Sequence, residues 1–210
     1  MENIINKAKK WLDESFDAET RKEVQRMIDN DHALLTESFY KDLEFGTGGL
    51  RGIMGVGSNR MNKYTVGMAT QGLSNYLIKN FPNTKIKCAI AFDCRNNSDY
   101  FAKISASVLS ANGIKVYLFE SLRPTPELSF AIRHLQCHSG IVITASHNPK
   151  EYNGYKAYWQ DGGQIINPHD IGIINEIRNI KDLSQVKFDD NLKNVEIIGE
   201  DIDNAYINKL

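Results

Sequence analysis

Between residues 86 and 144 the chain alternates between two hydrophobic patterns, and this alternation constrains its fold more than any other feature. Short apolar runs, typical of buried strands, lie at three places: residues 86–92, 115–119 and 140–144. Two segments with helical spacing separate them, beginning at Ser98 and at Thr125. Strands and helices in this order need right-handed crossovers, so the segment predicts an α/β domain with a mostly parallel sheet.

Helical patterns flank this segment on both sides. Before it, the spacing predicts helices over residues 4–16, 20–29 and 38–43, a strand over 50–54 and a helix over 66–77. After it, we expect a helix from Asn167-Pro168, a strand near Val195 to Ile198 and a final helix near Asp203. The expected organisation is a helical extension over residues 1–40, an α/β domain over 41–200 and the start of a further helix over 201–210.

The composition is that of an ordinary globular protein. The 210 residues are 41% hydrophobic and carry a formal net charge of −1, which gives no support for a nucleic-acid or membrane-surface partner. No apolar run approaches the roughly 20 residues of a membrane span, and the amphipathic N-terminus does not resemble a signal peptide. The three cysteines, Cys88, Cys94 and Cys137, have no CxxC spacing, so we expect buried free thiols in a reducing cytoplasm.

Ser146 follows the third apolar strand, where parallel sheets collect their ligands. Asp93 and Arg95 follow the first strand and are expected at the same edge. Ser146 could be a turn residue in Ser-His-Asn-Pro, or a hydrolase nucleophile. Against the latter, its surroundings are not the G-x-S-x-G elbow, and the adjacent His147 is poorly placed as a base.

A serine that carries a phosphoryl group suits these residues better. Such a group needs cations and backbone N–H donors around its oxygens. His147 and Lys156 are the nearby cationic candidates, and Arg51 lies in a loop with six glycines between residues 46 and 57. This loop matches neither the P-loop nor a clean G-x-G-x-x-G pattern, which leaves nucleotide binding with little support and structural turns as the alternative.

Other polar pairs have simpler explanations. His134 and His138 have the i, i+4 spacing that can chelate a metal, but no carboxylate accompanies them. Asp201 and Asp203 are explained by an acidic helix N-terminus. The aromatic pair Tyr158 and Trp159 is expected to pack in the core.

Several motifs together resemble one known family. "TASHNP" (144–149) resembles the phosphoserine loop of the phosphoglucomutase/phosphomannomutase superfamily, the α-D-phosphohexomutases. "NGYKAY" (153–158), "FGTGGLRG" (45–52) and "FDCRNNS" (92–98) resemble further signatures of that family in the matching order. The resemblance implies a three-layer αβα domain with a mixed sheet, the first of four domains. The glycine loop and the helical extension resemble most the long subgroup with phosphopentomutases and glucose-1,6-bisphosphate synthases.

The resemblance also implies a mechanism. A phosphate on Ser146 passes to a sugar phosphate, and the other phosphate of the resulting bisphosphate then returns to Ser146, so that phosphate moves between C1 and C6 or C1 and C5. Lys156 and Arg51 are expected at the reacting hydroxyl, with Lys156 as general acid/base and His147 positioning the phosphoserine or sharing the proton transfer. The residues expected to bind substrate or phosphate are Thr47, Gly48, Arg51, Asn148 and Arg95. Glucose 1,6-bisphosphate is the expected activator.

The family binds Mg²⁺ through one oxygen of the phosphoserine, here on Ser146, and three aspartates of a D-G-D-x-D-R loop. The sequence contains no such loop, so the main ligands are expected outside it. We therefore expect an N-terminal fragment of a cytoplasmic enzyme that folds alone but is inactive without the remaining domains of its polypeptide. The alternative is a non-catalytic phosphate-binding or regulatory module of the same fold. Glucose, mannose and pentose phosphates all remain possible substrates.

Overall fold

Six strands form one mixed sheet at the centre of the molecule in a computed structural model that describes residues 1–210. The strands lie in the order β1-β5-β4-β2-β3-β6. Five of them run in the same direction, and β5 alone is antiparallel to both of its neighbours. Their bounds are β1 Gly49–Ile53, β2 Lys87–Phe92, β3 Lys115–Phe119, β4 Ser139–Ile143, β5 Tyr152–Trp159 and β6 Val195–Ile198.

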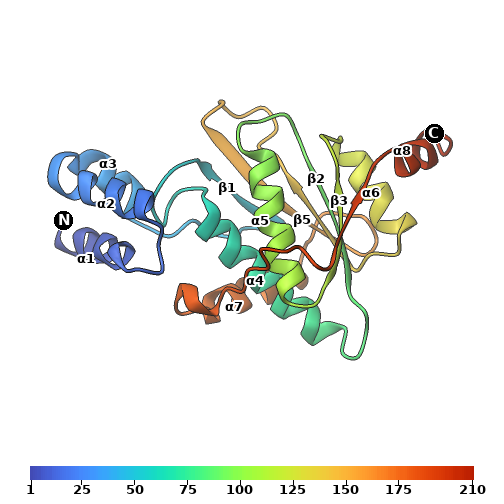
Figure 1. The fold of residues 1–210 in the computed structure, drawn as a ribbon, viewed down its shortest axis with the longest axis horizontal. Coiled ribbons are helices and arrows are strands. Elements are labelled where there is room, and N and C mark those ends of the chain that lie inside the picture. The colour runs from blue at the N-terminus through green and yellow to red at the C-terminus, as the bar shows by residue number, and fades with distance from the viewer.

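Helices cover both faces of this sheet, which gives the domain three layers (Figure 1). Helices α4, α5 and α7 pack on one face and α6 and α8 on the other. The helices are α1 Glu2–Lys9, α2 Ala18–Asn30, α3 His32–Phe39, α4 Lys63–Asn80, α5 Ser98–Ala111, α6 Thr125–His134, α7 His169–Asn179 and α8 Glu200–Ile207. The α/β prediction and its mixed sheet are therefore confirmed.

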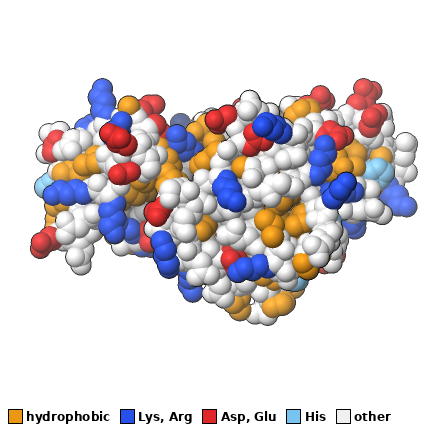
Figure 2. All heavy atoms as spheres, turned by 60° about the horizontal axis from the view of Figure 1, so that its bottom comes forward, with side chains coloured by type: hydrophobic (Ala, Val, Ile, Leu, Met, Phe, Trp, Pro, Cys, Tyr) orange, Lys and Arg blue, Asp and Glu red, His pale blue; other side chains and the backbone are white.

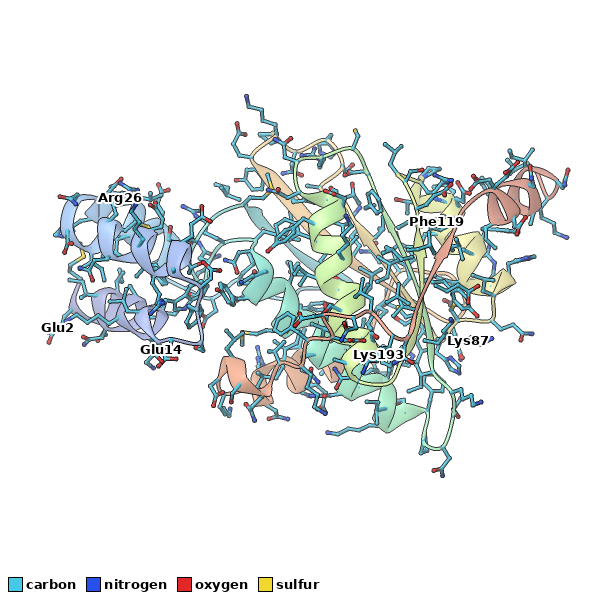
Figure 3. The ribbon with its side chains drawn as sticks, viewed as in Figure 1. Glu2, Glu14, Arg26, Lys87, Phe119 and Lys193 are labelled. Atoms are coloured by element: carbon cyan, nitrogen blue, oxygen red, sulfur yellow. The ribbon has the colours of Figure 1, made fainter.

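The central strands are buried on both faces because helices cover both. Every residue of β4 is buried, and so are the four residues from Cys88 to Ala91 in β2. The larger core lies between the sheet and α4, α5 and α7. The smaller core contains Phe119 of β3, which Figure 3 labels, and lies against α6 and α8. Continuous apolar runs in the sequence thus correspond to the strands at the centre of the sheet.

The helical extension has its own small core and lies beside the sheet (Figure 1). Ala8, Val24, Met27, Leu35 and Phe39 are buried in it, while Glu2, Glu14 and Arg26 lie on its exposed surface (Figure 3). The extension contacts the segment after β1: Asn59 N–H donates to the Ser38 carbonyl at 2.9 Å.

Two boundaries in the extension differ from prediction. The expected helix over residues 4–16 is instead α1 followed by a 3-10 turn over Lys10–Leu12, and it stops at Asp13, which is extended. The third helix is α3, His32–Phe39, and not residues 38–43. Asp31 explains the shift, because its carboxylate caps the backbone N–H of Leu34 and so starts the helix earlier.

One further expectation fails beside β2. Cys94 is exposed, in contrast to the buried thiols of Cys88 and Cys137; all three are free, as expected. Ser98 does not cap α5 with its side chain. Asn97, with φ of 62°, precedes the helix, and the Ser98 hydroxyl donates to Asp93 at 2.7 Å instead.

The surface carries both signs of charge in close alternation. Figure 2 shows lysine and arginine side chains interspersed with aspartate and glutamate on the face it presents. None of the helices combines the length and apolar character that crossing a bilayer requires.

Candidate active site

Ser146 lies in the connection between β4 and β5, at the carboxyl edge of the sheet. Its side chain is exposed and its φ is 54°, a left-handed conformation that costs a non-glycine residue about 1–3 kcal/mol. Thr144, the residue after β4, accepts the Ser146 N–H with its hydroxyl at 3.0 Å. The strand therefore ends by turning the serine hydroxyl out of the sheet into solvent.

His147 lies closer to Ser146 than the sequence suggested. Its Nδ1 is 3.3 Å from Ser146 Oγ, the outer limit of a hydrogen bond. A hydrolytic triad also needs a third group that orients the histidine, and no side chain hydrogen-bonds the other ring nitrogen. The contact thus places His147 at the serine without completing a triad.

Arg51 and Lys156 lie on the same face of the sheet. In the β1–β5 ladder Arg51 is opposite Gly154, and Lys156 is opposite Gly49. The two cations are therefore diagonal neighbours across the ladder, with Cα atoms roughly 7–8 Å apart. A glycine is opposite each of them, so neither cation has a side chain directly across the ladder.

Arg51 is joined directly to the serine loop. Its Nη1 donates to Asn148 Oδ1 at 3.0 Å, a contact between residues far apart in the sequence. Lys156, half-buried, lies opposite Val142 of β4 on its other side. The structure thus brings Ser146, His147, Asn148 and Arg51 together at one edge of the sheet, with Lys156 on the neighbouring strand, diagonal to Arg51.

Thr47 and Gly48 form the tip of a tight turn before β1. Gly46 and Gly49 close the turn by exchanging backbone hydrogen bonds of 2.7 and 3.2 Å. Gly48 has φ of 76°, and its carbonyl accepts the Ala157 N–H from the strand that carries Lys156. The N–H groups of Thr47 and Gly48 have no partner, but Gly48 is buried beside Gln164, so the exposed donor of this turn is the N–H of Thr47.

The structure gives Arg95 a different place from the expected one. Its side chain is only 13% exposed, and its Nη atoms donate to four backbone carbonyls of the serine loop. A guanidinium has four N–H groups on its Nη atoms, and all four are used there. Arg95 has no such group left for a substrate phosphate.

Sequence reasoning missed a buried network beneath the loop. Ser98 Oγ donates to Asp93, and Asn153 Nδ2 donates to Ser98 Oγ at 3.0 Å. Asn153 also accepts the Gly154 N–H with its side-chain oxygen. The motifs "FDCRNNS" and "NGYKAY" are thus in physical contact; the buried asparagine before the glycine was the available signal.

The residues do not include a metal cage. No group of three or more histidine, cysteine, aspartate or glutamate side chains lies close enough together to hold an ion. His134 stacks on Phe130, and His138 Nδ1 accepts the Lys87 N–H, so these two rings serve packing and the backbone. These residues alone therefore do not fit a metal site.

The remaining polar and aromatic candidates are structural, as expected. Asp201 and Asp203 lie in the first turn of α8, and Asp203 forms a bidentate pair with Arg123 at 2.7 Å. Tyr158 is buried in the smaller core, and Trp159 stacks on His169 at 3.9 Å between ring centroids.

The fold and the edge site together define an α/β domain with an exposed serine among cations. Residues 42–184 match the family model described as "Phosphoglucomutase/phosphomannomutase, alpha/beta/alpha domain I". The chain therefore belongs to the phosphoglucomutase/phosphomannomutase family, and the resemblance of its motifs is confirmed.

Relatives and solved structures agree with this membership. The chain is 42% identical over 190 residues to a human phosphopentomutase, covering 87% of this chain and 31% of that protein. It is 40% identical over 178 residues to a phosphoglucomutase of Staphylococcus haemolyticus, covering 83% and 32%. A putative phosphomannomutase from Thermus thermophilus superposes with a TM-score of 0.68 at 27% identity, covering 80% and 35%. The chain thus spans about a third of the length of these relatives.

Proposed function

We propose that this chain carries the phosphoserine of a phosphosugar mutase, with Ser146 as the phosphoryl carrier. The observation that supports this most is the exposed Ser146 in a left-handed loop, joined through Asn148 to Arg51. The relatives named above, phosphopentomutase and phosphoglucomutase, fit a sugar phosphate as substrate. We propose that the domain acts with further domains of a longer polypeptide and is inactive by itself.

In the proposed reaction, the bond between Ser146 Oγ and phosphorus breaks while a sugar hydroxyl oxygen bonds to that phosphorus. The hydroxyl proton passes to Lys156, with His147 as the second candidate for this transfer. Arg51 stabilises the charge that spreads over the equatorial oxygens of the transferred group. The departing Ser146 Oγ takes up a proton, for which His147 Nδ1, 3.3 Å away, is the candidate donor. After the bisphosphate turns over, Ser146 Oγ gives this proton back as it attacks the other phosphate, and the proton held by Lys156 returns to the sugar oxygen that leaves.

The remaining residues would bind phosphate and orient the serine. The exposed N–H of Thr47, in the turn that Gly48 allows, suits the phosphate of the sugar that does not react in that step. Asn148 holds Arg51 in place through its side-chain oxygen. Mg²⁺ is the cofactor that the resemblance to the family implies. We propose that its ligand here is an oxygen of the phosphate on Ser146, with the other ligands from outside these residues.

The test follows phosphorus into the protein. The full-length protein that contains these residues is incubated with Mg²⁺ and ³²P-labelled glucose 1,6-bisphosphate, and the label is mapped by peptide. We expect label in the peptide with Ser146, no label in Ser146→Ala, and unchanged labelling in Ser15→Ala, which removes an exposed hydroxyl from the helical extension. Folded protein that takes no label anywhere would instead support the non-catalytic phosphate-binding module.

A further inference from the structure

Arg95 directs its guanidinium into the serine loop and away from solvent. We propose that Arg95 is a positioning residue, which holds the loop over residues 146–152 so that Ser146 Oγ faces the substrate. This inference rests on the proposed function, because it assigns Arg95 a part in the reaction of Ser146.

The hydrogen bonds span the whole loop. Arg95 Nη2 donates to the carbonyls of Ser146 and Asn148, both at 2.5 Å. Nη1 donates to the carbonyls of Pro149 and Tyr152 at 3.0 and 3.1 Å. One planar side chain therefore sets the orientation of four peptide groups between the reacting serine and the first residue of β5.

Apart from Arg95, three contacts from outside the loop hold it: Thr144 Oγ accepts the Ser146 N–H, Arg51 donates to Asn148 Oδ1, and Met54 N–H donates to the Glu151 carbonyl at 2.8 Å. None of them holds more than one residue of the loop. Its own backbone supplies only the bonds from Asn148 N–H to Ala145 and from Tyr152 N–H to Pro149. Ser146 is held in a left-handed conformation that an L-residue seldom adopts unless its surroundings impose it. The charge-assisted bond from Arg95 to the Ser146 carbonyl fixes the orientation of the peptide that follows the serine, and so favours this conformation.

Arg95 is itself anchored to the sheet. Its backbone N–H donates to Asp93 Oδ1 at 3.0 Å, and its Nε lies 3.7 Å from Asp93 Oδ2. Asp93 accepts from Ser98, and Ser98 accepts from Asn153, both of which are fully buried. The loop is thereby tied through Arg95 to the end of β2, the start of α5 and β5.

Arg51 differs from Arg95 in each of these respects. It is exposed, and one hydrogen bond to Asn148 is its only side-chain contact of this kind. Its other N–H groups remain available to an anion. The two arginines at this edge therefore have different roles: Arg51 faces the substrate, and Arg95 faces the loop.

Arg95→Lys is the informative variant, because lysine keeps the charge but presents a compact ammonium that cannot reach four carbonyls at once. Arg123→Lys is the matched control: its guanidinium is also 13% exposed and hydrogen-bonded, but to Asp203 of α8 instead of the serine loop. Both variants are made in the full-length protein.

Three measurements are compared. The initial rate of ³²P transfer from glucose 1,6-bisphosphate to Ser146 is expected to fall about 100-fold in Arg95→Lys, because misplacing a reacting atom by about 1 Å costs that much. Binding of the same compound, measured calorimetrically in a Ser146→Ala background, is expected to change less than about twofold. Amide hydrogen exchange over residues 144–152 is expected to accelerate. Arg123→Lys should leave all three unchanged.

The outcomes separate this inference from the proposed function. If Arg95→Lys weakens binding as much as it slows labelling and leaves exchange unchanged, Arg95 contacts the phosphate and the inference is wrong. Labelling at the wild-type rate would also overturn it. If the wild-type protein takes no label, the proposed function fails, and the exchange of residues 144–152 alone decides whether Arg95 holds the loop.

Discussion

Glycine at position 154 is required by the closeness of three strands. A Cβ there would lie 2.5 Å from the Thr144 carbonyl oxygen and 3.3 Å from that of Leu50. Gly154 is also the residue opposite Arg51. The absence of a side chain at this position therefore lets β1, β5 and the end of β4 approach one another closely beside Arg51.

Gly154→Ala is expected to lower the free energy of unfolding by about 3 kcal/mol, because the methyl group must push backbone apart. Gly46→Ala is the control: its nearest contact would be an ordinary 3.8 Å, and we expect a change within about 0.5 kcal/mol. Urea unfolding of both variants measures the difference. Equal free energies of unfolding for the two variants would show that the strands can move apart at position 154 without a loss of stability.

Helix α8 is attached to α6 through a partly buried ionic cluster. Arg123 pairs with Asp203, and it lies 3.6 Å from Glu120 and 3.8 Å from Glu127. Burial, and then the neighbouring Asp203, raise the pKa of Glu127 to about 7. The hydrogen bond from Arg123 lowers the pKa of Asp203 below its usual 3.8. As the pH rises from the pKa of Asp203 through that of Glu127, Asp203 stays ionised and Glu127 loses its proton.

Stability is therefore expected to fall as the pH rises from about 4.5 to about 7. Folded protein keeps a proton on Glu127 that the unfolded chain has released, so the stabilisation is complete below the usual pKa of 4.5 and is lost through about 7. The loss should be roughly 2–3 kcal/mol. Denaturant unfolding at pH 5 and pH 8 measures it, and Glu127→Gln should remove this difference. If the wild-type protein is equally stable at both pH values, Glu127 does not keep its proton in the folded state.

The elements that the sequence predicted well are those with unbroken apolar runs. Strands β2, β3 and β4 agree with prediction to within a residue at each end, because a strand covered on both faces must be apolar throughout. Strand β5 was not predicted, since asparagine, glycine and lysine interrupt its pattern. Those polar residues are there because of the buried network and the open face next to Lys156.

The position of the site could be predicted from the sequence, but the arrangement of its side chains could not. Parallel strands bring Ser146, Asp93 and Arg95 to one edge, and this followed from the strand order. The proximity of Arg51 and Lys156 depends on the antiparallel register of β5, which no local pattern specifies. The direction of the Arg95 guanidinium depends on the path of the loop it holds, so sequence reasoning assigned it to the wrong partner.

The molecule as a whole consists of the α/β domain, with cores on both faces of its sheet, and a much smaller helical extension. The helical extension buries five side chains in its own core, whereas the core between the sheet, α4, α5 and α7 buries 23. A polar contact joins the two units: Asp17 caps α2, accepts the Tyr64 hydroxyl at 2.7 Å and pairs with Lys63 at 2.8 Å. Although burial raises the pKa of Asp17, the Lys63 and Thr20 hydrogen bonds lower it far below its usual range.

We expect the extension to open at a lower free energy than the sheet. Asp17→Ala should lower the opening free energy of α1–α3 by about 1–2 kcal/mol, since it removes a helix cap and the contacts to α4. Amide exchange resolved by peptide measures this, with β2 and β4 as internal references. Asp13→Ala, which loses only a local bond to Ser15, serves as the control. Equal acceleration across the whole chain would mean that extension and sheet unfold as one unit.

The hairpin of β4 and β5 bears on the order in which the chain folds. Eight residues, 144–151, join these strands, whereas Arg51 reaches Asn148 across 97 positions of sequence. Closing the longer loop costs about 2 kcal/mol more in chain entropy. Serine and lysine are therefore expected to meet early in folding, and Arg51 arrives only when β1 docks. Strand β1 is therefore expected to join this side of the sheet last, and its Arg51 adds positive charge that a bound phosphate needs.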